Sequence, residues 1–119
     1  MNELIFDDPN YPERPEIIRQ VAAQVIKDFE MFGLTIVFNG DMLNVYSELF
    51  DQVSKQLEDL IKKDQQRFIS ILYRIDLSEQ QVKKALSDNP SRSFSAVLTD
   101  LILKRELQKV ILRNRFRDH

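Results

Sequence analysis

Apolar side chains recur at intervals of three and four residues along most of this 119-residue chain, and that spacing is typical of α-helices. The longest series lies between residues 43 and 75. At about 100° per residue its members share one helical face, and they are Leu43, Tyr46, Leu49, Phe50, Val53, Leu57, Leu60, Ile61, Phe68, Ile71, Leu72 and Ile75. The polar stretch 62–67 interrupts this series, but the apolar residues after it lie on the same helical face as those before it. The series therefore predicts either one helix over 41–75, about 50 Å long at 1.5 Å per residue, or two helices that bend near residues 62–65.

Start and stop residues delimit the other helices. The first helix is expected to end at Gly33, since glycine suits the left-handed conformation that follows a helix. Ser78 and Gln81 have the spacing of a capping box, and the last helix is expected to begin after Ser91 or Ser93. The length fits one domain over 1–119. The sequence thus predicts an all-α fold, a bundle of four to five helices.

The segment 34–38 has a different composition, β-branched and aromatic, and Asn39-Gly40 closes it. It is expected to form either a strand or a buried extended connector. A strand needs a partner for its backbone groups, and the only other candidate is the segment 4–6. The bundle is therefore predicted to carry at most a minor two-stranded β ribbon.

Residue types that enzymes commonly use are scarce. The chain has no cysteine, two glycines and one histidine, at its last position. These counts argue against a thiol nucleophile, a Ser-His-Asp triad, a sulfur or multi-histidine metal site and a glycine-rich phosphate loop. One close acidic pair, Asp76 and Glu79, lies near Tyr73, but we interpret it as a turn residue followed by a residue that favours a helix N-terminus. We expect no enzymatic activity, no cofactor and no metal.

Charge is spread unevenly along the chain. Residues 1–64 carry 13 acidic and 6 basic side chains, whereas residues 65–119 carry 6 acidic and 11 basic ones. We interpret this asymmetry mainly as attraction between two halves of one domain. The alternative is a nucleic-acid-associated accessory protein, in which basic side chains of the last helix displace counterions from phosphates. The anion-contacting residues would then be Lys104, Lys109, Arg113, Arg115 and Arg117.

The last helix carries two apolar stripes on nearly opposite sides. One is formed by Phe94, Val97, Leu98, Leu101 and Ile102, and the other by Leu103, Leu107, Val110 and Ile111. Either this helix runs through the centre of the bundle, or a second copy of the chain covers one stripe. We favour the second alternative, a homodimer whose interface contains the second stripe. The leading functional hypothesis is therefore a non-enzymatic assembly or interaction protein.

Two charged residues occupy positions where an apolar side chain is expected. Asp64 and Arg105 each lie on the apolar stripe of their own helix, and burying either charge alone would cost several kcal/mol. One hypothesis is that they pair with each other across the bundle. The rival hypothesis is that Asp64 caps a new helix beginning at Gln65.

Two segments, 72–79 and 101–110, resemble small uncharacterised all-helical bacterial proteins. The resemblance covers about a quarter of the chain and implies a bacterial, cytoplasmic protein without implying any activity. The acidic N-terminus lacks the basic start and apolar run of a signal peptide. No stretch approaches the ~20 apolar residues of a membrane span. We therefore expect a cytoplasmic protein with no membrane contact.

Overall fold

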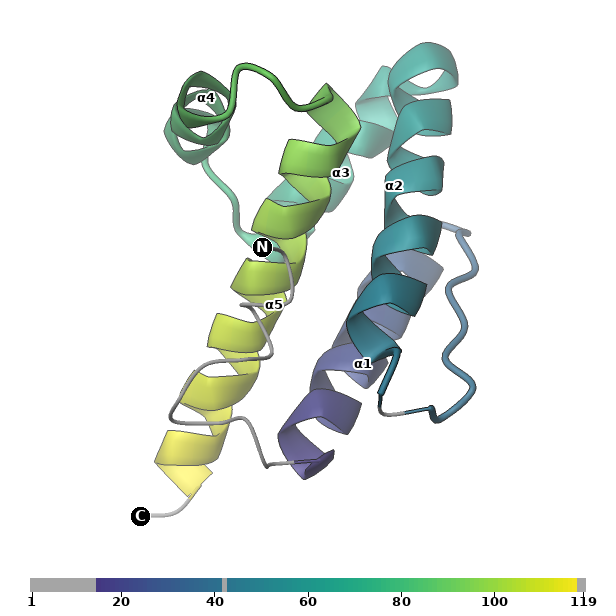
Figure 1. Ribbon diagram of the computed structural model, residues 1–119, viewed down its shortest axis with the longest axis vertical. Helices are drawn as coiled ribbons and strands as arrows, with labels where there is room; N and C mark the ends of the chain where they lie inside the picture. Colours follow the sequence, from purple (N-terminus) through teal and green to yellow (C-terminus); the bar gives the residue numbers. More distant parts are fainter. Residues whose placement is uncertain (1–14, 42, 118–119) are drawn as a thin grey trace.

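The computed structural model describes residues 15–41 and 43–117, which form helices α1 (Pro15–Glu30), α2 (Val45–Lys63), α3 (Gln65–Ile75), α4 (Glu79–Asp88) and α5 (Phe94–Arg117) (Figure 1). The described residues contain no strand. The radius of gyration is 14.0 Å, close to the ~13–14 Å of a compact chain of this length. The predicted all-α bundle is confirmed.

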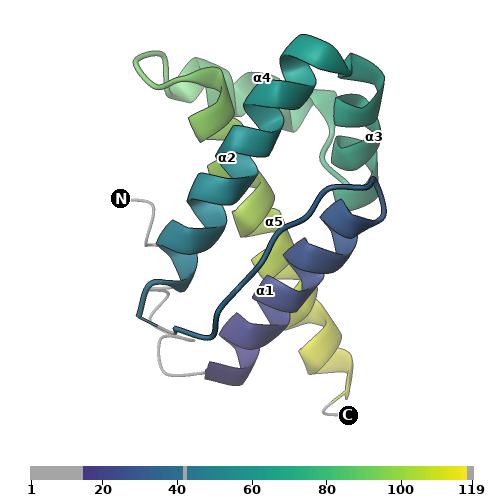
Figure 2. The ribbon, with the colours of Figure 1, turned by 90° about the vertical axis from the view of Figure 1, so that its right-hand side faces the viewer.

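Helix α5 is the longest helix and contacts all four others, so that it lies along the middle of the bundle (Figures 1 and 2). The second stripe is buried within one chain, and so are Val97, Leu98 and Ile102 of the first stripe, whereas Phe94 is 43% exposed. Leu103 and Val110 are fully buried, Leu107 is 7% exposed and Ile111 is partly buried. This corrects the expectation that these four residues form an exposed patch for a second copy. The first alternative is the observed one, because four helices surround α5.

The long apolar series is divided between α2 and α3 at Asp64. The N–H of Asp64 donates to the Leu60 carbonyl at 2.7 Å, and its carboxylate accepts the Arg67 N–H at 3.0 Å. Asp64 thus ends one helix and caps the next, as the rival hypothesis states. The predicted pairing of Asp64 with Arg105 is wrong, since Arg105 pairs with Asp76 at 2.9 Å.

Local hydrogen bonds confirm most of the predicted helix ends. Gly33 has φ +76°, and the N–H after it donates to the Phe29 carbonyl at 3.1 Å, which closes α1. Ser78 and Gln81 form both bonds of the capping box. Ser93 rather than Ser91 caps α5, through the Ala96 N–H at 3.2 Å.

The start of α2 differs from the prediction. The helix begins at Val45, whereas Asp41 accepts the Leu43 N–H at 3.1 Å and the Asn44 side chain at 2.6 Å. Its carboxylate therefore stabilises a turn ahead of the helix. Leu43, which was expected on the buried face, is 95% exposed as a result.

The segment 34–38 is an extended connector that runs back from the end of α1 toward the start of α2 (Figure 2). Gln52 on α2 accepts the Val37 N–H at 2.9 Å and donates to the Val37 carbonyl at 2.7 Å. Gln56 donates to the Thr35 carbonyl at 3.3 Å. Glutamine side chains thus satisfy backbone groups that a partner strand would otherwise satisfy. Residues 4–6, the other half of the predicted ribbon, lie outside the described residues.

Candidate functional site

Two acidic side chains meet in the interior, where α1, α3 and α5 pack together. Asp28 on α1 and Glu106 on α5 are both fully buried. The Asp28 carboxylate accepts hydrogen bonds from Arg74 Nε at 3.1 Å, Gln24 Nε2 at 3.0 Å and Lys109 Nζ at 3.3 Å. We call Asp28, Arg74, Glu106 and Lys109 the ionic centre. Its cations come from the basic half of the chain and Asp28 from the acidic half, in agreement with attraction between the halves.

Glu106 has fewer polar contacts than Asp28. Its Oε1 lies 3.1 Å from Lys109 Nζ, within ion-pair distance but outside hydrogen-bond geometry, and neither Oε atom accepts a hydrogen bond. Burial raises the pKa of Glu106 to about 8, and the hydrogen bond to Asp28 and the negative charge of Asp28 act in the same direction. A carboxyl with this pKa is protonated at neutral pH, so Asp28 and Glu106 together hold one proton.

The pKa of Asp28, in contrast, is lowered by its polar contacts. Burial alone would raise the pKa of Asp28, but the hydrogen bond with Glu106, the charge of Lys109, and the hydrogen bonds from Arg74 and Gln24 together lower it. Separated pKa values are also found in catalytic carboxyl pairs. However, the cavities at the α3–α4, α4–α5 and α2–α5 surfaces are lined by other residues. We therefore interpret the ionic centre as a device that joins three helices.

An apolar groove lies between α3 and α4. Its volume is about 440 Å³, and it is lined by Ile69, Leu72, Tyr73, Leu77, Ser78, Glu79 and Val82. Ile69 is 61% exposed and Tyr73 is 86% exposed, although both are large and mainly apolar. Exposed apolar residues that adjoin a groove are typical of interaction surfaces.

The outer side of α3 is uncharged. Gln66, Ile69, Ser70 and Tyr73 lie within about 100° of one another around the helix axis, and we call them the α3 face. The two charged residues of this helix, Arg67 and Arg74, form ion pairs with Asp64 at 3.2 Å and Asp28 at 3.1 Å. The α3 face therefore offers apolar surface and hydroxyl or amide groups without formal charge.

The basic residues predicted to contact an anion do not gather on one surface. Lys109 belongs to the ionic centre, and Arg113 donates to a glutamine of α1 at 2.9 Å. Lys104 and Arg115 are exposed. The side chain of Arg117 lies outside the described residues. Two of the five cations thus serve contacts between α5 and α1.

The two carboxylates of the acidic pair near Tyr73 form separate ion pairs. Asp76 adopts φ 70° at the C-terminal end of α3 and binds Arg105, whereas Glu79 begins α4 and binds Lys83 at 3.1 Å. Each carboxylate therefore has its own cation, which agrees with the interpretation as turn and helix-start residues. Within residues 15–41 and 43–117, no three acidic, histidine or cysteine side chains come together in a way that could hold a metal ion. No helix there has the length and apolar composition needed to cross a membrane.

Comparison with other proteins gives no relative for this chain. No family model, curated protein or solved structure matches it significantly. Its function is therefore inferred from its own surface and packing.

Proposed function

We propose that this protein is a non-enzymatic interaction protein that forms a homodimer through the α3 face. The supporting observation is the exposure of Ile69 and Tyr73, which lie one turn apart on that face beside the apolar groove. Tyrosine is enriched in protein interfaces, and charged residues are depleted in interface cores. Both features describe the α3 face.

A second copy of the chain is the partner that this composition favours. Twofold symmetry brings the same patch of both subunits together, so a charged patch would meet its own charge. The α3 face avoids this repulsion because Arg67 and Arg74 are paired within the chain. The adjoining groove between Leu72 and Val82 can accept a side chain from the second copy.

The remaining parts of the proposal follow from composition and resemblance. The absence of cysteine and the single histidine support a role without catalysis or cofactor. The bacterial, cytoplasmic setting implied by the resemblance of segments 72–79 and 101–110 belongs to the same proposal. The nucleic-acid alternative has less support, because Lys109 and Arg113 are engaged in contacts with α1.

Light scattering on the full chain tests the dimer. The wild type is expected to have twice the 14.1 kDa mass of one chain, and Tyr73→Glu is expected to have the mass of a single chain with unchanged helical content. Leu112→Glu is the matched control, because Leu112 is 45% exposed on α5 and lies outside the α3 face. A wild type that has the mass of one chain at millimolar concentration would contradict the proposal.

A further inference from the structure

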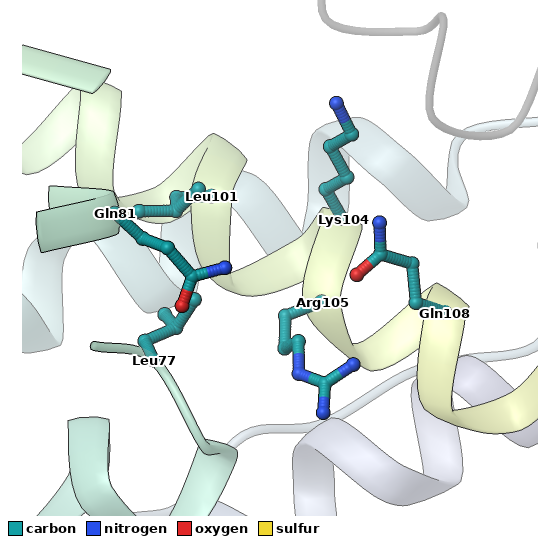
Figure 3. A pocket seen from close by; sticks show the side chains of 6 residues that line it. All are labelled: Leu77, Gln81, Leu101, Lys104, Arg105 and Gln108. Atoms are coloured by element: carbon teal, nitrogen blue, oxygen red, sulfur yellow. The ribbon is translucent and has the colours of Figure 1, made fainter. Parts of the chain in front are cut away.

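A second cavity lies between the first turn of α4 and the middle of α5 (Figure 3). Its volume is about 130 Å³, and it is lined by Leu77, Gln81, Leu101, Lys104, Arg105 and Gln108. Two of these side chains are cationic, two are amides and none is a carboxylate. The lining therefore combines N–H donors and positive charge with an apolar wall, unlike the groove between α3 and α4.

Gln81 contributes a donor whose orientation is already fixed. Its Oε1 accepts the Ser78 N–H at 2.9 Å as part of the capping box. Nε2, with its two N–H groups, is thereby turned toward the space between α4 and α5 (Figure 3). Gln108 on α5 also lines the cavity, and its amide group points toward Lys104 (Figure 3). A preorganised donor loses little conformational entropy when a ligand binds.

Arg105 contributes a positive charge to the lining of the cavity. One of its N–H groups donates to Asp76 at 2.9 Å. A guanidinium group has five N–H donors, so several remain for a ligand. Lys104 stands at the rim, where its side chain is exposed and forms no ion pair with the rest of the described chain (Figure 3).

We infer that this cavity binds a small oxyanion such as inorganic phosphate, held by Arg105 and by the amides of Gln81 and Gln108. With a volume of about 130 Å³, the cavity has room for a small tetrahedral anion. The planar guanidinium can donate two parallel hydrogen bonds to such an anion. Leu77 and Leu101 supply the apolar part of the lining.

A free anion fits this cavity better than the backbone of a nucleic acid. Asp76, which binds Arg105, is exposed, and so is Glu79 at the start of α4. A polymer would bring further phosphates past these two carboxylates, and the like charges would repel one another. A single oxyanion brings fewer negative charges close to these two carboxylates than a polymer does.

Nuclear magnetic resonance titration of the full chain with sodium phosphate tests this inference, with sodium chloride at equal ionic strength as reference. Phosphate is expected to shift the side-chain amide signals of Gln81 and Gln108 in a saturable way. Arg105→Gln should weaken binding about tenfold, because a charge-assisted hydrogen bond is lost. Asp76→Asn should strengthen it, since Arg105 is then released from its partner. Lys55→Gln, at an exposed position on α2, should leave binding unchanged.

Gln108→Ala provides a second variant, because this exposed side chain can be shortened without disturbing the core. It too should weaken phosphate binding relative to the Lys55→Gln control. Shifts that do not saturate, or equal affinity in wild type, Arg105→Gln and Gln108→Ala, would overturn the inference. An oligonucleotide that shifts the same signals while inorganic phosphate does not would also overturn it, in favour of a polymeric ligand.

Discussion

Replacing Glu106 with glutamine is expected to remove most of the pH dependence of stability between pH 5 and 8. Glutamine keeps the shape of the protonated carboxyl and an N–H donor toward Asp28, but it cannot ionise. In the wild type, burial raises the pKa of Glu106 from 4.5 to about 8. The folded protein therefore holds a proton that the unfolded chain has released throughout this range.

The sign and size of the effect follow from linkage. A carboxyl whose pKa is raised on folding contributes its full stabilisation below the unfolded value of 4.5, and this contribution is lost as the pH rises toward 8. One pKa unit corresponds to about 1.4 kcal/mol, so the wild type should lose about 3 to 4 kcal/mol between pH 5 and 8. That is a large part of the ~5–15 kcal/mol by which proteins are stable. The lowered pKa of Asp28 adds no slope in this range, because its stabilisation is lost only in more acidic solution.

Urea unfolding followed by circular dichroism at several pH values measures this slope. The free energy of unfolding of Glu106→Gln should stay nearly constant while that of the wild type falls. Glu30→Gln, which changes an exposed carboxyl on α1, should reproduce the wild-type slope. Parallel curves for wild type and Glu106→Gln would refute the shared-proton account of the ionic centre.

Two further predictions concern the caps and the core. Ser78→Ala and Asp64→Ala should each lower the free energy of unfolding by about 1 kcal/mol, because each removes an N-cap hydrogen bond. The control variant Ser91→Ala should leave the free energy of unfolding unchanged. Denaturant titration measures the difference between these variants. Val110→Asp should unfold the chain rather than yield a folded monomer, because Val110 is fully buried inside one chain. A helical, monomeric Val110→Asp protein would show that α5 is not enclosed as described.

Helix boundaries could be predicted where a few neighbouring residues determine them. The bonds of Ser78 with Gln81, and those around Gly33, lie within one helical turn, and the sequence contains both partners. Asp41 shows the limit of this reasoning. A carboxylate ahead of an apolar series can cap a helix or stabilise a turn, and the turn with Asn44 delays the helix to Val45.

Two residues of the ionic centre can be recognised in the sequence as charges at apolar positions, but periodicity alone does not show that they contact each other. Glu106 lies between Leu103 and Val110 on an apolar stripe of α5, and Asp28 lies three residues after Val25 on the stripe of α1. Charges at such positions indicate a buried partner. Which residues form the pair depends on how α1 and α5 pack, and no local spacing encodes that packing.

The expectation that the second stripe of α5 is an exposed patch was wrong for a similar reason. Periodicity shows which residues share a side of α5, but it does not show how many helices cover that side. Ile69 and Tyr73 lie off the apolar series of α3, which contains Phe68 and Ile71. Apolar residues outside the buried stripe are the better indicator of an exposed patch, and they identify the α3 face.

Cysteine cross-linking tests the α3-face homodimer most directly. The natural chain has no cysteine, so a single substitution reports one contact only. Ser70→Cys lies in the middle of the α3 face and leaves Ile69 and Tyr73 intact, and Leu112→Cys on α5 serves as control. Mild oxidation is expected to join Ser70→Cys chains into covalent dimers much faster than Leu112→Cys chains. Equal rates for the two variants would contradict pairing through the α3 face.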